Sequence, residues 1–179
     1  MTMSENRVTG EVMIDEKRIT ARAKEIGKAI SEEFAGEEVL LIGILKGAFM
    51  WLSDLARFIE IDVNIDFMAV ASYGASTKST GIVKIVKDLD IPIDGKNVII
   101  VEDIVDSGVT LNYLRNYLLG MGPKCLKICT LLDKPAGRRI DINVDYIGFT
   151  VEDKFIVGYG LDFDQRYRNL PYITCLTGS

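Results

Sequence analysis

The chain contains no histidine, so it lacks the side chain that most often moves protons near neutral pH. Acid–base chemistry must therefore fall to aspartate, glutamate, lysine or tyrosine. Cysteine is scarce as well: three residues, Cys125, Cys129 and Cys175, are too few for a zinc site without histidine. Their odd number does not suit a disulfide framework, and we interpret all three as reduced thiols of the core.

Long hydrophobic runs are also missing. No apolar stretch approaches the roughly 18 residues of a membrane-spanning helix, and no secretory apolar segment follows Met1. We therefore expect a cytoplasmic protein with no membrane partner. A basic excess is absent too, because 21 Lys and Arg against 26 Asp and Glu give a net charge of −5. We expect no nucleic-acid partner, and an anionic substrate would need Mg²⁺ or a focused basic pocket.

What is present is enough apolar material, 48% of 179 residues, for one domain with a sizeable core. We find no internal repeat, low-complexity tract or linker. Three- and four-residue spacing of apolar side chains predicts helices over 15–35, 48–59 and 111–119. Apolar runs predict strands over 39–44, 63–73, 82–89, 98–101, 124–132, 144–150 and 155–159, with 82–89 antiparallel to 63–73. A polar tail is expected over 1–11 and a helical turn within 161–169. The alternation predicts an α/β fold with a mostly parallel, twisted sheet flanked by helices.

The most informative stretch runs from Val98 to Thr110. Four β-branched residues predict a strand buried on both faces, and ligands bind at the carboxyl ends of such strands. Glu102 and Asp103 follow, and their oxygens suit a sugar diol or a hydrated Mg²⁺. A third carboxylate, Asp106, comes just before the turn. The next residues, Ser107-Gly108-Val109-Thr110, can turn tightly and present backbone N–H groups at a helix start, where a phosphate binds well.

A plainer interpretation is that these acids only end a strand in solvent and cap the next helix. Other phosphate motifs are absent, however. There is no Gly-x-x-x-x-Gly-Lys-[Ser/Thr], and Gly158-Tyr159-Gly160 is followed by Asp162-Phe163 where a dinucleotide fingerprint needs a third glycine.

Further candidates are weaker when taken singly. Lys134 follows a predicted strand at the same sheet edge, where it would either bind a ligand oxygen or lie in solvent. Phe155 alone is more often core than a stacking platform, and Asp162 alone is more often a turn residue. Arg166 and Arg168 suit either a solvated face or a phosphate clamp. The Ser-, Thr- and Gly-rich segment 72–81 predicts either a mobile loop or a long connection without function.

The Val98–Thr110 run resembles the motif that binds 5-phosphoribosyl-1-pyrophosphate (PRPP) in type I phosphoribosyltransferases. With the later residues, the chain resembles the hypoxanthine-guanine type from about Val39 to its C-terminus. The resemblance implies one phosphoribosyltransferase domain, 1–179, with a small hood formed by the N-terminal segment and about 150–179. Leu45-Lys46-Gly47 resembles the family's pyrophosphate turn, whose Leu–Lys peptide is cis in several members. Ser72-Tyr73 resembles the start of a lid over 72–81.

The resemblance also implies the role of each site residue. Glu102 and Asp103 would hold the ribose hydroxyls directly or through Mg²⁺, with Asp162 as a further metal-linked acid. Ser107, Gly108, Val109 and Thr110 would hold the 5′-phosphate, and Asp106, beside them, would be the general base. Lys46, Gly47 and Arg168 would bind pyrophosphate, whereas Lys134, Phe155, Ile156 and Asp162 would bind the purine.

The implied reaction joins hypoxanthine or guanine to PRPP and releases pyrophosphate. Val109 stands where some relatives carry lysine, which leaves phosphate binding to backbone N–H groups and hydroxyls. Two alternatives stay open: a transferase that prefers xanthine or guanine, and a non-catalytic PRPP-sensing regulator. A regulator needs a basic face or a DNA-binding module, whereas this chain is acidic and begins almost directly with its first helix. An apolar face on the helix over 48–59 would suit a homodimer or homotetramer.

Overall fold

The structure is a computed structural model that describes residues 10–72 and 83–176. Its centre is a six-stranded sheet in the order β4-β3-β2-β5-β6-β7. Neighbouring strands run parallel except at the β3–β4 pair, which is antiparallel. The predicted α/β class and mostly parallel sheet are confirmed. The strands are β2 (Val39–Leu45), β3 (Val63–Ser72), β4 (Val83–Lys87), β5 (Asn97–Val105), β6 (Cys125–Asp133) and β7 (Tyr146–Thr150).

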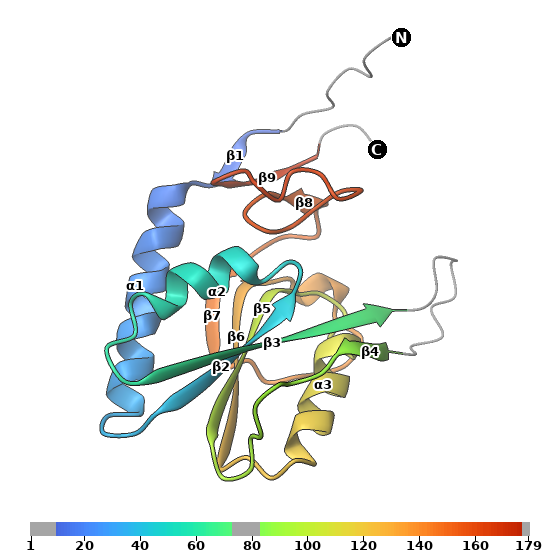
Figure 1. Ribbon diagram of the computed structural model, residues 1–179. Coiled ribbons are helices and arrows are strands. Elements are labelled where there is room, and N and C mark those ends of the chain that lie inside the picture. The colour runs from blue at the N-terminus through green and yellow to red at the C-terminus, as the bar shows by residue number, and fades with distance from the viewer. Residues whose placement is uncertain (1–9, 73–82, 177–179) are drawn as a thin grey trace.

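Helices cover both faces of this sheet (Figure 1). The helices α1 (Glu16–Glu33) and α2 (Phe49–Ala56) lie on one face, and α3 (Val109–Leu119) lies on the other. Two hydrophobic cores result, one on each side of the sheet. The β5 residues from Val98 to Val101 are fully buried between them, which explains the continuous apolar run in the sequence.

Helix α1 shows how local signals set an element's limits. Asp15 caps it, because its side chain accepts a hydrogen bond from the Arg18 backbone N–H at 2.8 Å. Past its end, Gly36 has a φ of +80°, a conformation that glycine adopts without strain. Its buried side chains follow the predicted spacing: Ile19, Ala23, Ile26 and Ile30.

A second, three-stranded sheet lies above the main one in Figure 1. It joins β1 (Val12–Ile14), β9 (Ile173–Cys175) and β8 (Ile156–Val157) in that order, so the two ends of the described chain meet in it. Sequence patterns did not predict β1 or β9, since three residues are too few to show a period. The strand expected over 155–159 is reduced to β8.

The prediction of a helical turn within 161–169 is wrong. Asp164, Gln165 and Tyr167 have φ between 50° and 73°, which no right-handed helical turn accommodates. Phe163 and Arg166 instead form an isolated antiparallel bridge. The lid predicted over 72–81 lies outside the described residues except for Ser72, the last residue of β3, and Tyr73 is among those outside.

The cysteines carry no disulfide in the described chain. Only Cys129 is fully buried, and there burial raises the pKa of its thiol to about 12. Cys125 is partly buried and packs against the core, so the prediction of core thiols is confirmed for Cys129 and Cys125. Cys175, which is also partly buried, is not among the core residues.

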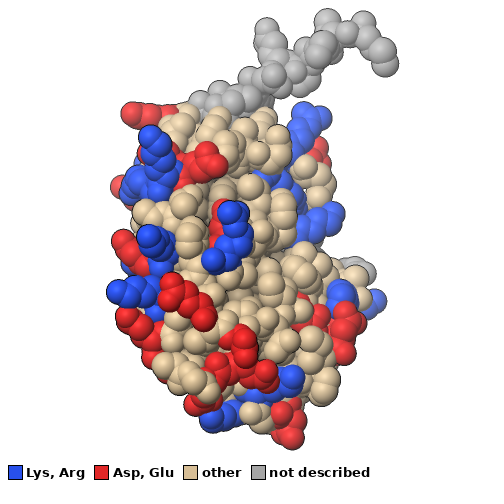
Figure 2. Space-filling view, turned by 60° about the vertical axis from the view of Figure 1, so that its left-hand side comes forward, with Lys and Arg blue, Asp and Glu red and all other residues tan. Residues whose placement is uncertain are grey.

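Charge is mixed on the surface that Figure 2 shows, where Lys and Arg stand among Asp and Glu and are separated by uncharged residues. This face offers no continuous basic patch. Within residues 10–72 and 83–176, no helix is long and apolar enough to cross a membrane.

Candidate active site

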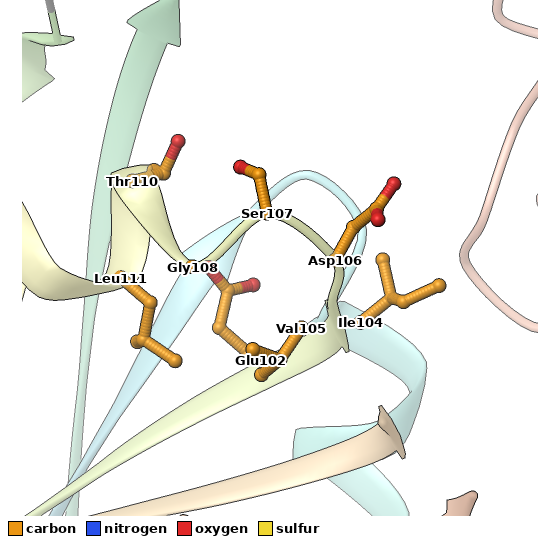
Figure 3. Close-up of a pocket in the computed structure, with 8 residues that line it drawn as sticks. All are labelled: Glu102, Ile104, Val105, Asp106, Ser107, Gly108, Thr110 and Leu111. Carbon is orange, nitrogen blue, oxygen red and sulfur yellow. The ribbon is translucent and has the colours of Figure 1, made fainter. Parts of the chain in front are cut away.

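The acidic end of β5 and the turn after it form a small cavity at the carboxyl edge of the main sheet. The cavity measures about 110 Å³. In Figure 3 the Ser107 and Thr110 hydroxyls and the Asp106 carboxylate project to the same side of the chain, and the Glu102 carboxylate lies beneath them. Its lining consists of Glu102, Ile104, Val105, Asp106, Ser107, Gly108, Thr110 and Leu111.

The turn takes this shape because of Gly108, which has a φ of +79° and stands as the N-cap of α3. A Cβ at this position would lie 2.6 Å from the Ile140 carbonyl oxygen, so only glycine fits. Helix α3 therefore starts at the cavity with its first N–H groups and the positive end of its dipole nearby. A hydroxyl-lined hollow at such a helix start is suited to a phosphate group. The Val109 side chain is not part of the lining, so any contribution of Val109 is from its backbone.

A distant segment fixes the turn from outside. The Ser107 carbonyl accepts hydrogen bonds from the backbone N–H groups of Arg139 and Ile140, at 2.9 and 3.1 Å. The Arg138 guanidinium donates to the Asp106 carbonyl at 3.0 Å and pairs with Asp133. Sequence analysis did not single out Arg138, and no local pattern marks a residue that acts on a turn 32 positions earlier.

Glu102 and Asp103 are consecutive acidic residues near the end of β5, the first buried and the second partly buried. Burial raises the pKa of Glu102 well above its ordinary value, and the neighbouring Asp103 charge raises it further. Burial likewise raises the pKa of Asp103, against the opposing effect of the Ile104 N–H that its carboxylate accepts at 2.8 Å. A buried acid beside a partly buried one disfavours the ionisation of both, and a cation or a row of hydroxyl donors would relieve this cost.

The Lys46–Gly47 turn lies directly on Asp103. The Leu45–Lys46 peptide bond is cis, as the resemblance implied. A Cβ on Gly47 would come within 1.6 Å of an Asp103 carboxylate oxygen, so the turn can approach only because this residue is glycine. The Lys46 ammonium lies 3.2 Å from the Gln165 side-chain oxygen, which links this turn to the segment after β8.

That segment also holds Arg168 beside the acids. The Arg168 guanidinium pairs with Asp162 at 2.7 Å and donates to the Gly160 carbonyl, also at 2.7 Å. Its positive charge acts to lower the pKa of Asp103. The Arg168 Nε is buried without a hydrogen-bond partner among the described residues. Lys46 and Arg168, which are far apart in the sequence, are thus brought to the same edge of the sheet.

On the other side of the cavity, Lys134 follows the end of β6 and reaches back to Asp106. Its ammonium lies 3.2 Å from an Asp106 carboxylate oxygen and 3.0 Å from an Asp153 carboxylate oxygen. Gly137 also lies against Asp106, because a Cβ at residue 137 would be 1.7 Å from the other Asp106 carboxylate oxygen. A phosphate-sized hollow, a half-exposed carboxylate and a held ammonium thus stand together.

This arrangement agrees with the comparisons to known proteins. Residues 13–164 match the family model described as the phosphoribosyl transferase domain. The chain belongs to the phosphoribosyltransferase family.

Similar proteins within the family have specific names. The hypoxanthine phosphoribosyltransferase of Salmonella typhimurium is 50% identical over 167 residues, which cover 92% of this chain and 94% of that protein. The hypoxanthine-guanine phosphoribosyltransferase of Bacillus subtilis is 49% identical over 166 residues, 93% and 92% of the two chains. A crystal structure of a hypoxanthine-guanine phosphoribosyltransferase from Bacillus anthracis superimposes with a TM-score of 0.90 at 48% identity, covering 94% and 99% of the two chains.

The residues predicted to bind Mg²⁺ in this phosphoribosyltransferase are only partly assembled. Asp162 is engaged by Arg168 and by the Gln165 backbone N–H at 2.8 Å. Among the described residues, no three His, Cys, Asp or Glu side chains form a group able to hold a metal ion. The set Glu102, Asp103 and Asp162 is therefore not brought together as three ligands. Glu102 and Asp103 still fit Mg²⁺, which usually takes one or two carboxylates together with substrate oxygens and water.

Two of the predicted purine-binding residues, Phe155 and Ile156, differ in exposure. Phe155 exposes about half of its surface and meets the equally exposed Phe163 edge to face, with ring centroids 5.5 Å apart. An exposed aromatic face can stack on a heterocycle. The Ile156 side chain, by contrast, is buried in the core, so only its backbone remains for a ligand. Phe163 was not predicted as a site residue.

Proposed function

We propose that this protein transfers the phosphoribosyl group of PRPP to hypoxanthine and to guanine, a reaction of purine salvage. The observation that carries the proposal is the contact between Lys134 and Asp106, a residue that lines the cavity together with the hydroxyls of Ser107 and Thr110. This contact supports the proposal because it joins a proton acceptor and a cation beside a cavity suited to the phosphate of a ribose. Relatives about 50% identical carry the names hypoxanthine and hypoxanthine-guanine phosphoribosyltransferase.

The reaction breaks one bond to the anomeric carbon and forms another. The bond between the anomeric carbon and the pyrophosphate oxygen breaks, and a bond from that carbon to N9 of the purine forms. The proton on N7 passes to the Asp106 carboxylate, which acts as general base in a chain without histidine. The products are the nucleoside monophosphate and pyrophosphate.

Each substrate part has its own group of residues. Ser107, Thr110 and the N–H groups at the start of α3 hold the 5′-phosphate. Glu102 and Asp103 hold the ribose hydroxyls directly or through Mg²⁺. When bound, Mg²⁺ supplies positive charge for the departing pyrophosphate. Lys46 and Arg168 supply further positive charge at the same edge of the sheet, so the leaving group is stabilised by this chain's own residues as well.

Base selection depends on Lys134. An ammonium donates to the O6 acceptor of hypoxanthine or guanine, whereas the amino group of adenine would meet a second donor at that position. Phe155 stacks on the purine, and backbone carbonyls near Ile156 and Asp162 accept from the guanine amino group. Because these carbonyls do not depend on side-chain identity, a preference for xanthine or guanine remains the alternative within the same class.

The test is an assay with PRPP and Mg²⁺ and, in turn, hypoxanthine, guanine, xanthine and adenine. We expect nucleotide formation with hypoxanthine and guanine, and very little with adenine. Highest activity with xanthine would favour the alternative specificity. No nucleotide from any base, together with tight and salt-sensitive DNA or RNA binding, would reject the transferase in favour of a regulator.

The remaining expectations are also proposals. Dependence on Mg²⁺ is tested by removing the metal with a chelator and adding it back. A cytoplasmic location is tested by cell fractionation. A homodimer or homotetramer finds support in the exposed Phe49 of α2, and light scattering measures the subunit number.

A further inference from the structure

Asp153 is an acidic residue for which no role was predicted from the sequence. It lies in the segment between β7 and β8, two residues before Phe155. Its carboxylate is 3.0 Å from the Lys134 ammonium, on which Asp106 also converges at 3.2 Å. The Lys134 side chain is only 13% exposed, so these two carboxylates dominate its surroundings.

An ammonium carries three N–H donors. In this structure two of them are directed to Asp106 and Asp153, which leaves one for another acceptor. If Asp106 were its sole partner, the ammonium would be drawn onto that carboxylate and away from a neighbouring acceptor. A second carboxylate from another segment of the chain opposes that displacement.

We propose that Asp153 is a positioning residue that holds the Lys134 ammonium between two carboxylates, leaving one N–H for the purine six-oxo group and Asp106 available for the N7 proton. This inference rests on the proposed function. Asp153 itself would touch neither the purine nor PRPP.

The charge changes during turnover favour this role. Asp106 becomes neutral when it accepts the N7 proton, so Lys134 then loses one of its two charge partners. Asp153 keeps its charge and stabilises the ammonium in both states. Burial alone would lower the pKa of Lys134, but the hydrogen bonds to Asp153 and Asp106 outweigh burial and raise it.

The backbone fixes both partners. The Lys134 N–H donates to the Val105 carbonyl at 2.9 Å, next to Asp106 in the chain. The Val151 N–H donates to the Asp133 carbonyl, also at 2.9 Å, and this bond fixes the start of the segment that carries Asp153. Main-chain pairing therefore fixes where the backbones of Lys134 and the Asp153 segment lie, and the short Asp153 side chain needs to span little distance to meet the ammonium.

The adjacent pair Glu152–Lys154 provides a matched control. Its charged atoms are 2.7 Å apart and both side chains are more than half exposed, as is that of Asp153, but neither of them pairs with the largely buried Lys134 ammonium. Exposed ion pairs of this kind contribute little. Glu152→Gln removes one negative charge from the same segment without touching Lys134.

The experiment compares Asp153→Ala, Asp153→Asn and Glu152→Gln with the unaltered enzyme, measuring kcat, the KM of hypoxanthine, the KM of PRPP and the rate with adenine. We expect Asp153→Ala to raise the KM of hypoxanthine about 10-fold, as suits the loss of one charge-assisted hydrogen bond, with the KM of PRPP changed less than about twofold. Discrimination against adenine should fall in parallel. Asp153→Asn keeps an acceptor oxygen, so its KM of hypoxanthine should lie between those of the unaltered enzyme and Asp153→Ala. Glu152→Gln should have the same KM values as the unaltered enzyme.

Three results would overturn the inference. An unchanged KM of hypoxanthine in both Asp153 variants is the first. Equal increases in both KM values are the second, since they would indicate general damage. The third is a rise in the KM of hypoxanthine in Glu152→Gln as large as in the Asp153 variants, since it would mean that the net charge of the segment, and not the contact with Lys134, causes the effect. All three leave the proposed function intact, whereas an unaltered enzyme that makes no IMP from hypoxanthine and PRPP rejects that function and, with it, this role of Asp153.

Discussion

The Lys134 ammonium lies 3.2 Å from a carboxylate oxygen of Asp106. The proposed purine selector and the proposed general base therefore touch each other, although 27 residues separate them in the sequence. Each constrains the position of the other, because opposite charges this close attract. A change to either side chain should therefore alter both purine binding and proton transfer. The relative size of the two effects identifies the role of the changed residue.

Asp106→Asn retains the shape of the side chain and an oxygen for Lys134, but it cannot accept the N7 proton. We expect kcat to fall roughly 10²- to 10⁴-fold, the usual contribution of a general base. PRPP binding should change little, since the hydroxyls and N–H groups of the turn remain. Steady-state IMP formation and a PRPP titration measure the two effects. Near-normal turnover would reject Asp106 as the base.

Lys134→Ala removes the donor to the six-oxo group. We expect the enzyme to lose most of its preference for hypoxanthine over adenine, because a site built to donate to O6 then has no donor left. The ratio of kcat/KM for the two bases is the measurement. Lys154→Ala, at an exposed lysine nearby, serves as the control and should keep the ratio. Selectivity that survives in Lys134→Ala would mean that another group reads the six position.

Gly137 tests the position of Asp106 without altering its chemistry. A Cβ at residue 137 would lie 1.7 Å from an Asp106 oxygen, so Gly137→Ala must displace that carboxylate. The Asp106 side chain is half exposed and can move at small cost, and we therefore expect a nearly unchanged melting temperature. Activity should fall at least about 10-fold, as a misplacement of a reacting group near 1 Å commonly causes.

The matched control for this change is Gly120→Ala. Gly120 is the C-cap of α3 with φ of −63°, and its added Cβ would meet only backbone oxygens of its own last helical turn at 3.3 Å or more. This variant should retain full activity. If Gly137→Ala were as active as Gly120→Ala, Asp106 would not need its present position.

The part of the site that local sequence could predict lies on one element. The strand β5 is buried on both faces, so its apolar run, its acidic end and the glycine turn appear consecutively in the chain and identify their own chemistry. The main sheet follows from the same kind of pattern. Lys134, Phe155 and Arg168 depended on family resemblance, because each is ambiguous by itself.

The supporting residues could not be predicted, for a physical reason. Asp153, Arg138 and Gly137 act through contacts between residues 19 to 32 positions apart, and no periodicity marks such contacts. Similarly, the turn after Asp162 depends on its carboxylate accepting the Gln165 N–H and on three residues with positive φ. These residues are polar, so the segment gave no sign of the close approach between Gly160 and the Gly47 carbonyl.

The buried acids allow a test in the absence of substrate. Burial and the Asp103 charge raise the pKa of Glu102 well above its ordinary value of 4.5. A carboxyl with a raised folded pKa stabilises the fold fully below its unfolded pKa and loses that contribution as pH rises through the folded value. The substrate-free enzyme should therefore lose stability from Glu102 as the pH increases from about 4.5 toward neutrality.

Glu102→Gln removes this ionisation and keeps the shape of the side chain. At about pH 7.5 we expect its melting temperature to exceed that of the unaltered protein by at least 2 °C, since 1 kcal/mol shifts a chain of this size by about 2–4 °C. The gain should vanish near pH 4, where Glu102 is protonated in both states. Calorimetry across this range measures both, with Glu60→Gln, at an exposed glutamate, as the control.

The same variant should bind Mg²⁺ and PRPP at least about 10-fold more weakly, because an amide is a poorer ligand for a hard cation than a carboxylate. Greater stability together with weaker binding would show that Glu102 is kept for the ligand at the expense of the fold. A variant that is less stable at every pH would contradict this, since the carboxylate would then be held by the protein itself. In that case the acidic end of β5 would be a structural feature of the sheet, and its part in holding the ribose and the metal would have to be abandoned.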